Sequence, residues 1–342
     1  MGKPTVRDIA RTAGVSLATV DRVLNARPGV REKTIARVQA AITSLGYVRD
    51  LSAANLARKR QYRFVFVLPE GPGQFVDTIR EALREVTASS HSDRISINTL
   101  LVPSHDPHAT ARAIHRIRLS DVEGVAIMAP ETPQVRDAIT QLHDAGVAVV
   151  ALVSDLPSTK RDHFVGIENR AAGRTAAVLM GRFQARQKAE VLVVASSMLA
   201  RDSIERRLGF DAAMQETFPD IHVLPSVEGH DDPERMADVI AAAFRTHPGI
   251  SGVYSLGSGN QALLDAIRPQ RSGGSLVVVG HELTPRMRQA LVDGEVDAVI
   301  TQNVGHLVRS AVRVLKAKCD DAEIVESQER IRIDIVLREN LP

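Results

Sequence analysis

The sequence predicts an α/β protein with a small all-helical N-terminal head, a short hinge and a large two-part body built on parallel sheets. Two short helical patterns flank a glycine-bearing turn in TVRDIARTAGVSLATVDRVLN, residues 5–25. From Phe64 onward, short apolar runs alternate with amphipathic stretches, which is the rhythm of βαβ units and of parallel sheets covered on both faces. The rhythm restarts after an irregular stretch near residues 154–170, so two similar halves with a cleft between them are expected.

The head is expected to begin with a helix-turn-helix. Its apolar positions recur at helical spacing, at Ile9, Ala10, Val15, Val20, Val23 and Leu24. Thr5 and Asp8 have the spacing of a capping box, and Ser16 is placed to cap the second helix. That helix would present Leu17, Ala18, Thr19, Arg22 and Asn25 outward, as a major-groove recognition helix does. An ordinary helical hairpin with solvated arginines is the alternative, and the turn chemistry and basic surroundings argue against it.

A third helix is expected at Glu32–Leu45, because Pro28-Gly29 interrupts the chain and apolar residues then follow 3-4-3 spacing. The stripe consists of Ile35, Val38, Ile42 and Leu45. Gly46 is expected to end this helix. The connector that follows, 49–63, is Ala-rich near 51–58 and strongly basic. A two-turn helix is marginal alone, so the connector is either a hinge that folds against DNA or a partner copy, or a plain solvated linker.

The body is expected to contain strands at its short apolar runs and helices between them. The first-half strands are 64–69, 95–102, 124–130 and 147–153, separated by helices at 75–88, 107–119 and 133–145. The second-half strands are 190–196, 222–227, 252–257 and 275–280, with helices near 170–186, 204–217, 233–246 and 259–268. A last strand at 330–337 alternates polar and apolar residues, as an edge strand does.

Charge is distributed unevenly along the 342 residues. Residues 1–63 contain 13 Lys and Arg against 4 Asp and Glu, whereas the remainder contains 30 against 37. A basic head on an acidic body is the electrostatic footprint of nucleic-acid binding. The N-terminus lacks a signal-peptide core, no apolar run approaches the ~18 residues of a membrane span, and Cys319 is the single cysteine. These features predict a cytoplasmic setting and no membrane partner.

The segment VRDIARTAGVSLATVDRVLN, followed by the third helix and GYVRDLSAANLA, resembles the head of lactose-repressor-type (LacI/GalR) transcription regulators. The body resembles the family's periplasmic-binding-protein-like (type I) effector domain, most clearly in FVGIENRAAGRTAA, RRLGFDAAM, VVVGHELT and AVITQNVG. The resemblance implies a head at 1–48, a hinge at 49–62 and an effector domain at 63–342. Subdomain N would comprise about 63–166 and 303–324, and subdomain C about 167–302 and 325–342.

By position, the resemblance implies DNA contacts from the head and the hinge. These are Thr5, Ser16, Leu17, Ala18, Thr19, Arg22, Asn25, Val30, Arg31, Ala53 and Leu56. Arg22 can donate two hydrogen bonds to guanine, and Leu56 stands where relatives insert a leucine into the minor groove. Two positions depart from the family pattern. Asp21 would repel phosphate unless Arg7, Arg11 or Arg31 neutralises it, and Arg31 replaces a small capping residue.

The cleft is expected to bind a small molecule through side chains that follow successive strands. The candidates are Phe75, Glu131, Arg206, Ser258, Asn260, Glu282 and Gln302. Carboxylates, amides and an arginine around one aromatic ring suit a sugar or polyol, because each hydroxyl both donates and accepts. Any one of these residues is as well explained by a capping or surface role, but their spacing as a set favours a site.

The combined expectation is a ligand-responsive transcription regulator, a repressor of carbohydrate-utilisation genes that binds a pseudo-palindromic operator as a dimer. Gly71-Pro72-Gly73 lacks the pattern of a dinucleotide loop, and the turn at His105–His108 does not favour a metal site. No P-loop, HExxH or nucleophile elbow is present, so neither a cofactor nor catalysis is expected. The alternatives are a transport binding protein, a cytoplasmic sugar sensor, and a sugar-processing enzyme with a DNA-binding head.

Overall fold

The computed structural model describes residues 4–24, 27–47, 60–71, 73–89, 94–103, 106–184, 189–257, 259–273 and 276–342. The chain divides into two compact units, residues 1–60 and residues 61–342. We call them the head and the body. No helix of the described segments is long and apolar enough to cross a membrane.

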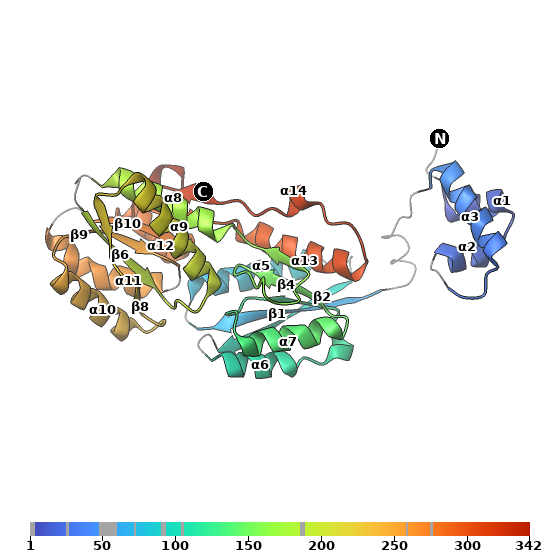
Figure 1. Cartoon of the computed structure of the whole chain (residues 1–342), viewed down its shortest axis with the longest axis horizontal. Coiled ribbons are helices and arrows are strands. Elements are labelled where there is room, and N and C mark those ends of the chain that lie inside the picture. Colours follow the sequence, from blue (N-terminus) through green and yellow to red (C-terminus); the bar gives the residue numbers. More distant parts are fainter. Residues whose placement is uncertain are drawn as a thin grey trace. The chain divides into compact units, whose positions relative to one another are not determined.

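The head is a three-helix unit, as expected, with α1 (Val6–Ala13), α2 (Leu17–Leu24) and α3 (Glu32–Leu45) (Figure 1). Ile9, Val20 and Val38 are fully buried at the point where the three helices meet. Gly14 ends α1 with φ +61°, a left-handed conformation that the tight turn requires and that glycine adopts without strain. The Ser16 hydroxyl accepts the Thr19 N–H at 3.1 Å, which confirms the predicted cap of α2.

At the start of α1, the Asp8 carboxylate accepts the Thr5 N–H at 2.9 Å, which supplies one half of the predicted capping box.

Both predicted ends of α3, Glu32 and Leu45, are confirmed. Arg31 precedes α3 without a side-chain cap, as expected from its lack of a short acceptor. The predicted hinge helix near 51–58 lies outside the described residues.

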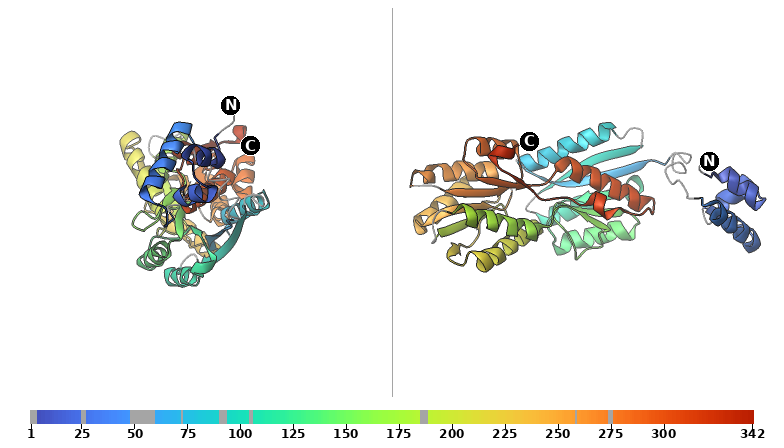
Figure 2. Two further views of the ribbon diagram at one scale, coloured as in Figure 1. Left: turned by 90° about the vertical axis from the view of Figure 1, so that its right-hand side faces the viewer. Right: turned by 90° about the horizontal axis from the view of Figure 1, so that it is seen from above.

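The first lobe of the body is a five-stranded parallel sheet in the order β2-β1-β3-β4-β5. Its strands are β1 (Tyr62–Glu70), β2 (Ile95–Pro103), β3 (Gly124–Ile127), β4 (Ala148–Leu152) and β5 (His163–Val165). One face packs on α5 (Gln74–Ser89) and α13 (Val304–Cys319), and the other on α6 (Pro107–His115) and α7 (Pro133–Asp144) (Figure 1). Helix α13 comes from near the C-terminus yet lies among the elements of this lobe (Figure 2).

The second lobe is a seven-stranded sheet in the order β12-β11-β10-β9-β6-β7, with β8 also paired to β6. Its strands are β6 (Ala189–Ala195), β7 (Ile221–Val223), β8 (Val227–Glu228), β9 (Ile250–Ser255), β10 (Val277–His281), β11 (Ala298–Thr301) and β12 (Asp334–Val336). Helices α8 (Asn169–Phe183) and α9 (Arg201–Thr217) cover one face. The other face packs on α10 (Pro233–Thr246), α11 (Asn260–Ile267) and α12 (Pro285–Val292).

The predicted βαβ order is confirmed in both lobes. The structure also contains elements that the sequence analysis did not predict, among them β5, α12, β11 and α13, and three predicted elements differ in detail. The helix expected at 107–119 ends at His115 and is followed by a 3-10 turn, Leu119–Asp121. The strand expected at 222–227 is divided into β7 and β8 around Pro225, which has no N–H to donate to a ladder. The last strand covers only Asp334–Val336 and pairs antiparallel with β11 at the sheet edge.

Candidate functional site

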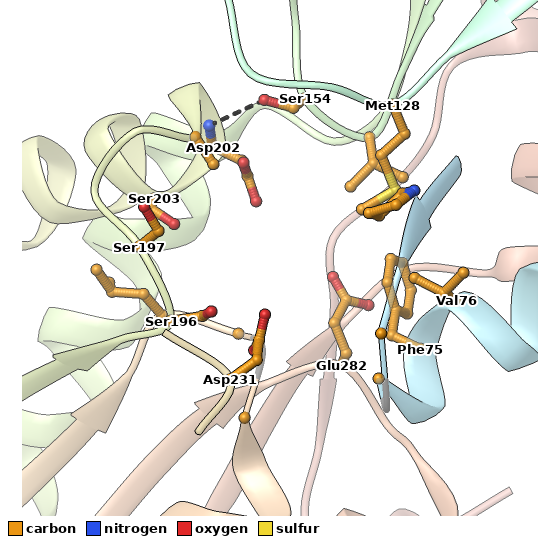
Figure 3. Close-up of a pocket in the computed structure, with 18 of the residues that line it drawn as sticks. Phe75, Val76, Met128, Ser154, Ser196, Ser197, Asp202, Ser203, Asp231 and Glu282 are labelled. Atoms are coloured by element: carbon orange, nitrogen blue, oxygen red, sulfur yellow. Dashed lines mark hydrogen bonds between the residues drawn. The ribbon is translucent and has the colours of Figure 1, made fainter. Parts of the chain in front are cut away.

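A cavity of about 180 Å³ lies between the two lobes, at the carboxyl ends of their strands. The first lobe contributes residues after β1, β3 and β4, and the second contributes residues after β6, β8, β9 and β10. Strand ends of two parallel sheets therefore face the same space, which is the usual place for a ligand in this type of fold. Figure 3 shows Phe75, Val76 and Met128 on the first-lobe side and Ser196, Ser197, Asp202 and Asp231 on the other (Figure 3).

Arg206 reaches the cavity because α8 and α9 cross with their backbones almost in contact. A Cβ atom on Gly173 would lie 1.9 Å from the Arg206 carbonyl oxygen, and one on Gly209 would lie 2.0 Å from the Arg170 carbonyl oxygen. Only glycine fits at both positions without moving a backbone. Gly173 lies in the segment RAAGR and Gly209 lies in RRLGF, so the two segments form a single helix crossing. This crossing places Arg206 beside the cavity.

The Arg206 guanidinium is held by three hydrogen bonds and is 2% exposed. Its Nε donates to Asn169 Oδ1 at 2.8 Å, and its Nη1 donates to the Leu256 carbonyl oxygen at 2.7 Å. Its Nη2 donates to Glu282 Oε1 at 3.4 Å, and Nη1 lies 3.8 Å from Asp202 Oδ2. The planar group is thus fixed in orientation before any ligand arrives.

Glu282 follows β10 and is 4% exposed. Its Oε1 accepts hydrogen bonds from Gln302 Nε2, at 3.1 Å, and from Arg206. Its Oε2 is buried and has no hydrogen-bond partner within the described part of the chain. Burial raises the pKa of Glu282 to about 7, although Arg206 opposes this shift. The residue also has φ +68°, a conformation that glycine adopts readily and glutamate adopts only under constraint.

A buried polar layer lies beneath these two residues. Tyr254 stacks on Phe210 with 4.4 Å between ring centroids, and its hydroxyl lies 2.8 Å from His281 Nε2. Burial holds the pKa of His281 well below its usual range and raises the pKa of Tyr254, so both rings stay uncharged. Asn260 donates to the His281 carbonyl oxygen and accepts from Ser255, each at 2.7–2.8 Å. These contacts fix the ends of β9 and β10 that carry the site.

The cavity brings together four of the seven candidate ligand residues: Phe75, Arg206, Asn260 and Glu282. Gln302 lies behind Glu282 and orients its carboxylate rather than lining the space. Ser258 lies outside the described residues. Glu131 requires a correction, because it lies apart from the cavity lining. Its Oε1 accepts the Ser158 N–H at 2.6 Å and its Oε2 lies 3.6 Å from Arg201.

These contacts with Ser158 and Arg201 occupy both carboxylate oxygens of Glu131. Sequence reasoning did not identify several polar residues that line the cavity: Ser154, Ser196, Ser197, Asp202, Ser203 and Asp231. Ser196 and Ser197 directly follow the predicted strand 190–196, so position at a strand end was a usable signal for them. Among the described residues, no three His, Cys, Asp or Glu side chains are arranged to hold a metal ion.

The head exposes the face of α2 that the sequence predicted. Leu17 is 48% exposed, Ala18 and Arg22 are exposed, and Thr19 is half-buried. Thr5, Ser16 and Arg31 are exposed and Val30 is half-buried. Asn25, Ala53 and Leu56 lie outside the described residues. A compact three-helix unit thus presents an apolar pair and an arginine side by side, as major-groove contact requires.

The expected partner of Asp21 needs a correction. The structure pairs Asp21 with Arg27, at 3.5 Å between Oδ2 and Nη1, whereas Arg11 pairs with Asp8. Arg27 reaches Asp21 because its N–H donates to the Arg22 carbonyl oxygen at 2.9 Å, which turns the chain back beside α2. Both partners are more than half exposed, so the pair contributes only ~0–1 kcal/mol to stability.

Two family models match the chain. The model described as "Periplasmic binding protein domain" matches residues 64–323, and the one described as "Bacterial regulatory proteins, lacI family" matches residues 5–50. The chain is 24% identical over 177 residues to the HTH-type transcriptional regulator DegA of Bacillus subtilis, which is 51% of each protein. It is 27% identical over 172 residues to catabolite control protein A of Streptococcus mutans, which is 49% of this chain and 50% of that protein. The chain thus spans about half the length of these curated relatives.

Solved structures share the fold of the body. GanP, a glucose-galactose binding protein from Geobacillus stearothermophilus, matches with a TM-score of 0.73 and 18% identity, over 83% of this chain and 99% of that one. A solute binding protein of an ABC transporter from Burkholderia graminis, in complex with D-arabinose, matches with a TM-score of 0.72 and 20% identity, over 82% and 96%. Since one model spans most of the chain, the chain belongs to the family of periplasmic binding protein domains, and it carries a helix-turn-helix head that matches the lacI family of bacterial regulatory proteins.

Proposed function

We propose that this chain is a ligand-responsive DNA-binding transcriptional regulator that acts as a repressor of carbohydrate-utilisation genes. One observation supports this proposal most strongly. A single chain joins a basic helix-turn-helix head, with its recognition face exposed, to a body that encloses a polar cavity. The proposal places the protein in the cytoplasm, as a dimer on a pseudo-palindromic operator, and gives it no enzymatic activity.

We propose the domain limits given by the family resemblance: a head at 1–48, a hinge at 49–62 and an effector domain at 63–342. In the head, Arg22 would read guanine, and Leu17 and Ala18 would contact apolar base edges such as a thymine methyl. Ser16, Thr19 and Arg31 would contact phosphates, which position the head without reading sequence. The hinge would add Ala53 and Leu56 at the operator centre.

The proposed ligand is a sugar or polyol. Arg206 and Glu282 offer a fixed donor and a buried acceptor on the same wall of the cavity, and Phe75 offers an apolar surface for the carbon face of a ring (Figure 3). GanP is described as a glucose-galactose binding protein, and the neighbour from Burkholderia graminis contains D-arabinose, so this fold is compatible with such ligands.

The ligand would act by holding the two lobes together. The chain crosses between the lobes at 165–169, 301–304 and 319–334, so the lobes can rotate about these segments. Among the described residues, direct hydrogen bonds already join them from Asp202 N–H to Ser154 Oγ at 3.3 Å, from Arg286 N–H to Gln74 Oε1 at 3.2 Å and from Asn169 Nδ2 to the Val153 carbonyl oxygen at 3.3 Å. A ligand that contacts both lobes would favour this arrangement and change operator affinity through a coupling of ~1–3 kcal/mol.

The test begins with selection of bound sequences from a random DNA library by the full chain. The selected duplex is then used in anisotropy titrations against random DNA of equal length. Arg22→Ala should weaken specific binding about tenfold or more, because one good base contact is worth ~1–3 kcal/mol. Arg245→Ala, which removes an exposed arginine of the body, is the matched control. Selection of no sequence above random, or an Arg22→Ala protein with unchanged specificity, would refute the proposed function.

A further inference from the structure

The charged groups that line the cavity are unbalanced. Among the described residues, four carboxyl groups line it, from Glu70, Asp202, Asp231 and Glu282, and Arg206 supplies the single positive charge. Three of these carboxyl groups come from three separate elements: the start of α9, the loop after β8 and the end of β10. Figure 3 shows Asp202, Asp231 and Glu282 pointing into the same open space (Figure 3).

Arg206 does not neutralise this excess of negative charge. Its two short hydrogen bonds, 2.8 and 2.7 Å, are to the neutral oxygens of Asn169 and Leu256. Its contacts with carboxylates are longer, 3.4 Å to Glu282 and 3.8 Å to Asp202. The guanidinium is therefore shared between two carboxylates, while its two shortest hydrogen bonds go to neutral oxygens.

Glu282 has one carboxylate oxygen whose hydrogen-bonding capacity is unused among the described residues. Its Oε2 is buried without a hydrogen-bond partner in the described part of the structure, and Gln302 and Arg206 both bind the other oxygen. The positive φ of Glu282 and the hydrogen bond from its N–H to the Ile300 carbonyl oxygen, at 2.8 Å, hold the carboxyl group in this place. Burial raises the pKa of this carboxyl group to about 7, although Arg206 and Gln302 oppose the shift.

A neutral hydroxyl group would satisfy the hydrogen bond at Oε2 but not the charge. A protonated amine would satisfy both, because an ammonium group has three donors and a positive charge. The acidic groups do not form a metal site, since no suitable triad exists among the described residues. Phe75, Val76 and Met128 provide an apolar wall for the carbon skeleton that carries the amine.

We propose that the ligand of this cavity is an amino sugar or amino polyol, whose ammonium group binds Glu282 Oε2 among the carboxylates of Asp202 and Asp231. This inference rests on the proposed ligand-responsive function and specifies the chemical class of the ligand. An acidic sugar is excluded by the same charges, and a neutral sugar is expected to bind more weakly than its amine counterpart.

The experiment uses matched pairs that differ only in the amine. Tris carries an ammonium group on its central carbon where pentaerythritol carries a fourth hydroxymethyl group, and in glucosamine an ammonium group replaces the 2-hydroxyl group of glucose. Thermal shift and calorimetry on the full chain in phosphate buffer at pH 7.5 should give an affinity at least tenfold higher for the amine of each pair. N-acetylglucosamine, which keeps the nitrogen but loses its charge, should bind like glucose.

Glu282→Gln keeps the shape of the side chain and removes its charge. In this variant the advantage of the amine should fall to threefold or less. Glu81→Gln, which changes an exposed carboxylate on α5, should keep the full advantage. Amines that bind no better than their neutral counterparts, or an amine advantage that survives in Glu282→Gln, would overturn the inference. Neither outcome affects the operator binding by which the proposed function itself is tested.

Discussion

The buried carboxyl group of Glu282 should make the stability of the ligand-free protein depend on pH. In the unfolded chain this side chain has its ordinary value of 4.5, whereas burial raises its pKa in the folded protein to about 7. Between these values the folded state binds more protons than the unfolded state, so the free energy of unfolding falls as pH rises. The contribution is complete below about pH 4.5 and is lost above about pH 7.

The size of this effect follows from the shift. The difference between 4.5 and about 7 corresponds to about 3 kcal/mol, since one pKa unit is worth about 1.4 kcal/mol. Three groups contact or face the carboxyl group: Arg206, Asp202 and Gln302. Arg206 and Gln302 lower its pKa and Asp202 raises it, and the pKa of about 7 results from burial together with these three groups. In a domain of this size, about 3 kcal/mol corresponds to a change in Tm of about 5 °C.

The assay compares the wild-type chain with Glu282→Gln between pH 5 and pH 8.5, without ligand and in buffers free of amines. The wild-type Tm should fall by about 5 °C relative to the variant over this range, because the variant has no proton to lose. Glu81→Gln controls for the loss of a carboxylate and should follow the wild type. Parallel Tm curves for wild type and Glu282→Gln would show that folding does not raise the pKa of this carboxyl group.

Three further changes test the site and the head. Gly173→Ala should lower the Tm by several degrees and abolish ligand-induced stabilisation, because its methyl group would separate α8 from α9. Gly305→Ala should do neither, because the nearest atom to its methyl group would be the end of the flexible Arg309 side chain. Arg206→Lys keeps the charge but loses the planar donor geometry, so calorimetry should show at least tenfold weaker ligand binding. Asp21→Ser should leave the circular dichroism spectrum unchanged and leave DNA affinity equal or higher, with a steeper salt dependence as Arg27 is released to bind phosphate; a large loss of affinity would mean that Asp21 itself reads a base.

The head could be predicted almost completely from the sequence because its determinants are local. The cap at Ser16, the turn at Gly14 and the bounds of α3 each depend on residues within four or five positions of one another. Most strands of the body were predictable for a related reason, since a strand that is buried on both faces must be a short apolar run, but the short strands β5 and β11 were missed. The exception was Asp21, whose partner Arg27 depends on how the chain turns after α2.

The site was less predictable because its contacts join distant parts of the chain. Arg206 bonds to residues that lie 37, 50 and 76 positions away, and no local pattern specifies such distances. Asp231 belongs to a turn in which it and His230 both have positive φ, at 59° and 52°, so its direction depends on backbone geometry. Glu131 follows a strand as expected, but its carboxylate contacts Ser158, 27 positions away, and Arg201, which no local pattern indicates.

The bonds between the lobes indicate why a small ligand can control the body. Among the described residues, two of these hydrogen bonds run from a backbone N–H at a helix N-terminus of the second lobe, at Asp202 and Arg286, to a neutral side chain of the first lobe. A third runs from the Asn169 side-chain amide to the Val153 carbonyl oxygen. A hydrogen bond of this kind contributes about 0.5–1.5 kcal/mol net, because water replaces it when the lobes separate. The partly exposed pair of Arg201 and Glu131 adds ~0–1 kcal/mol. Their sum is comparable to the coupling of ~1–3 kcal/mol expected for such regulators. The polar contacts between the lobes are therefore weak, and a ligand held on one side by Arg206 and Glu282 and on the other by Phe75 can add enough to decide their arrangement.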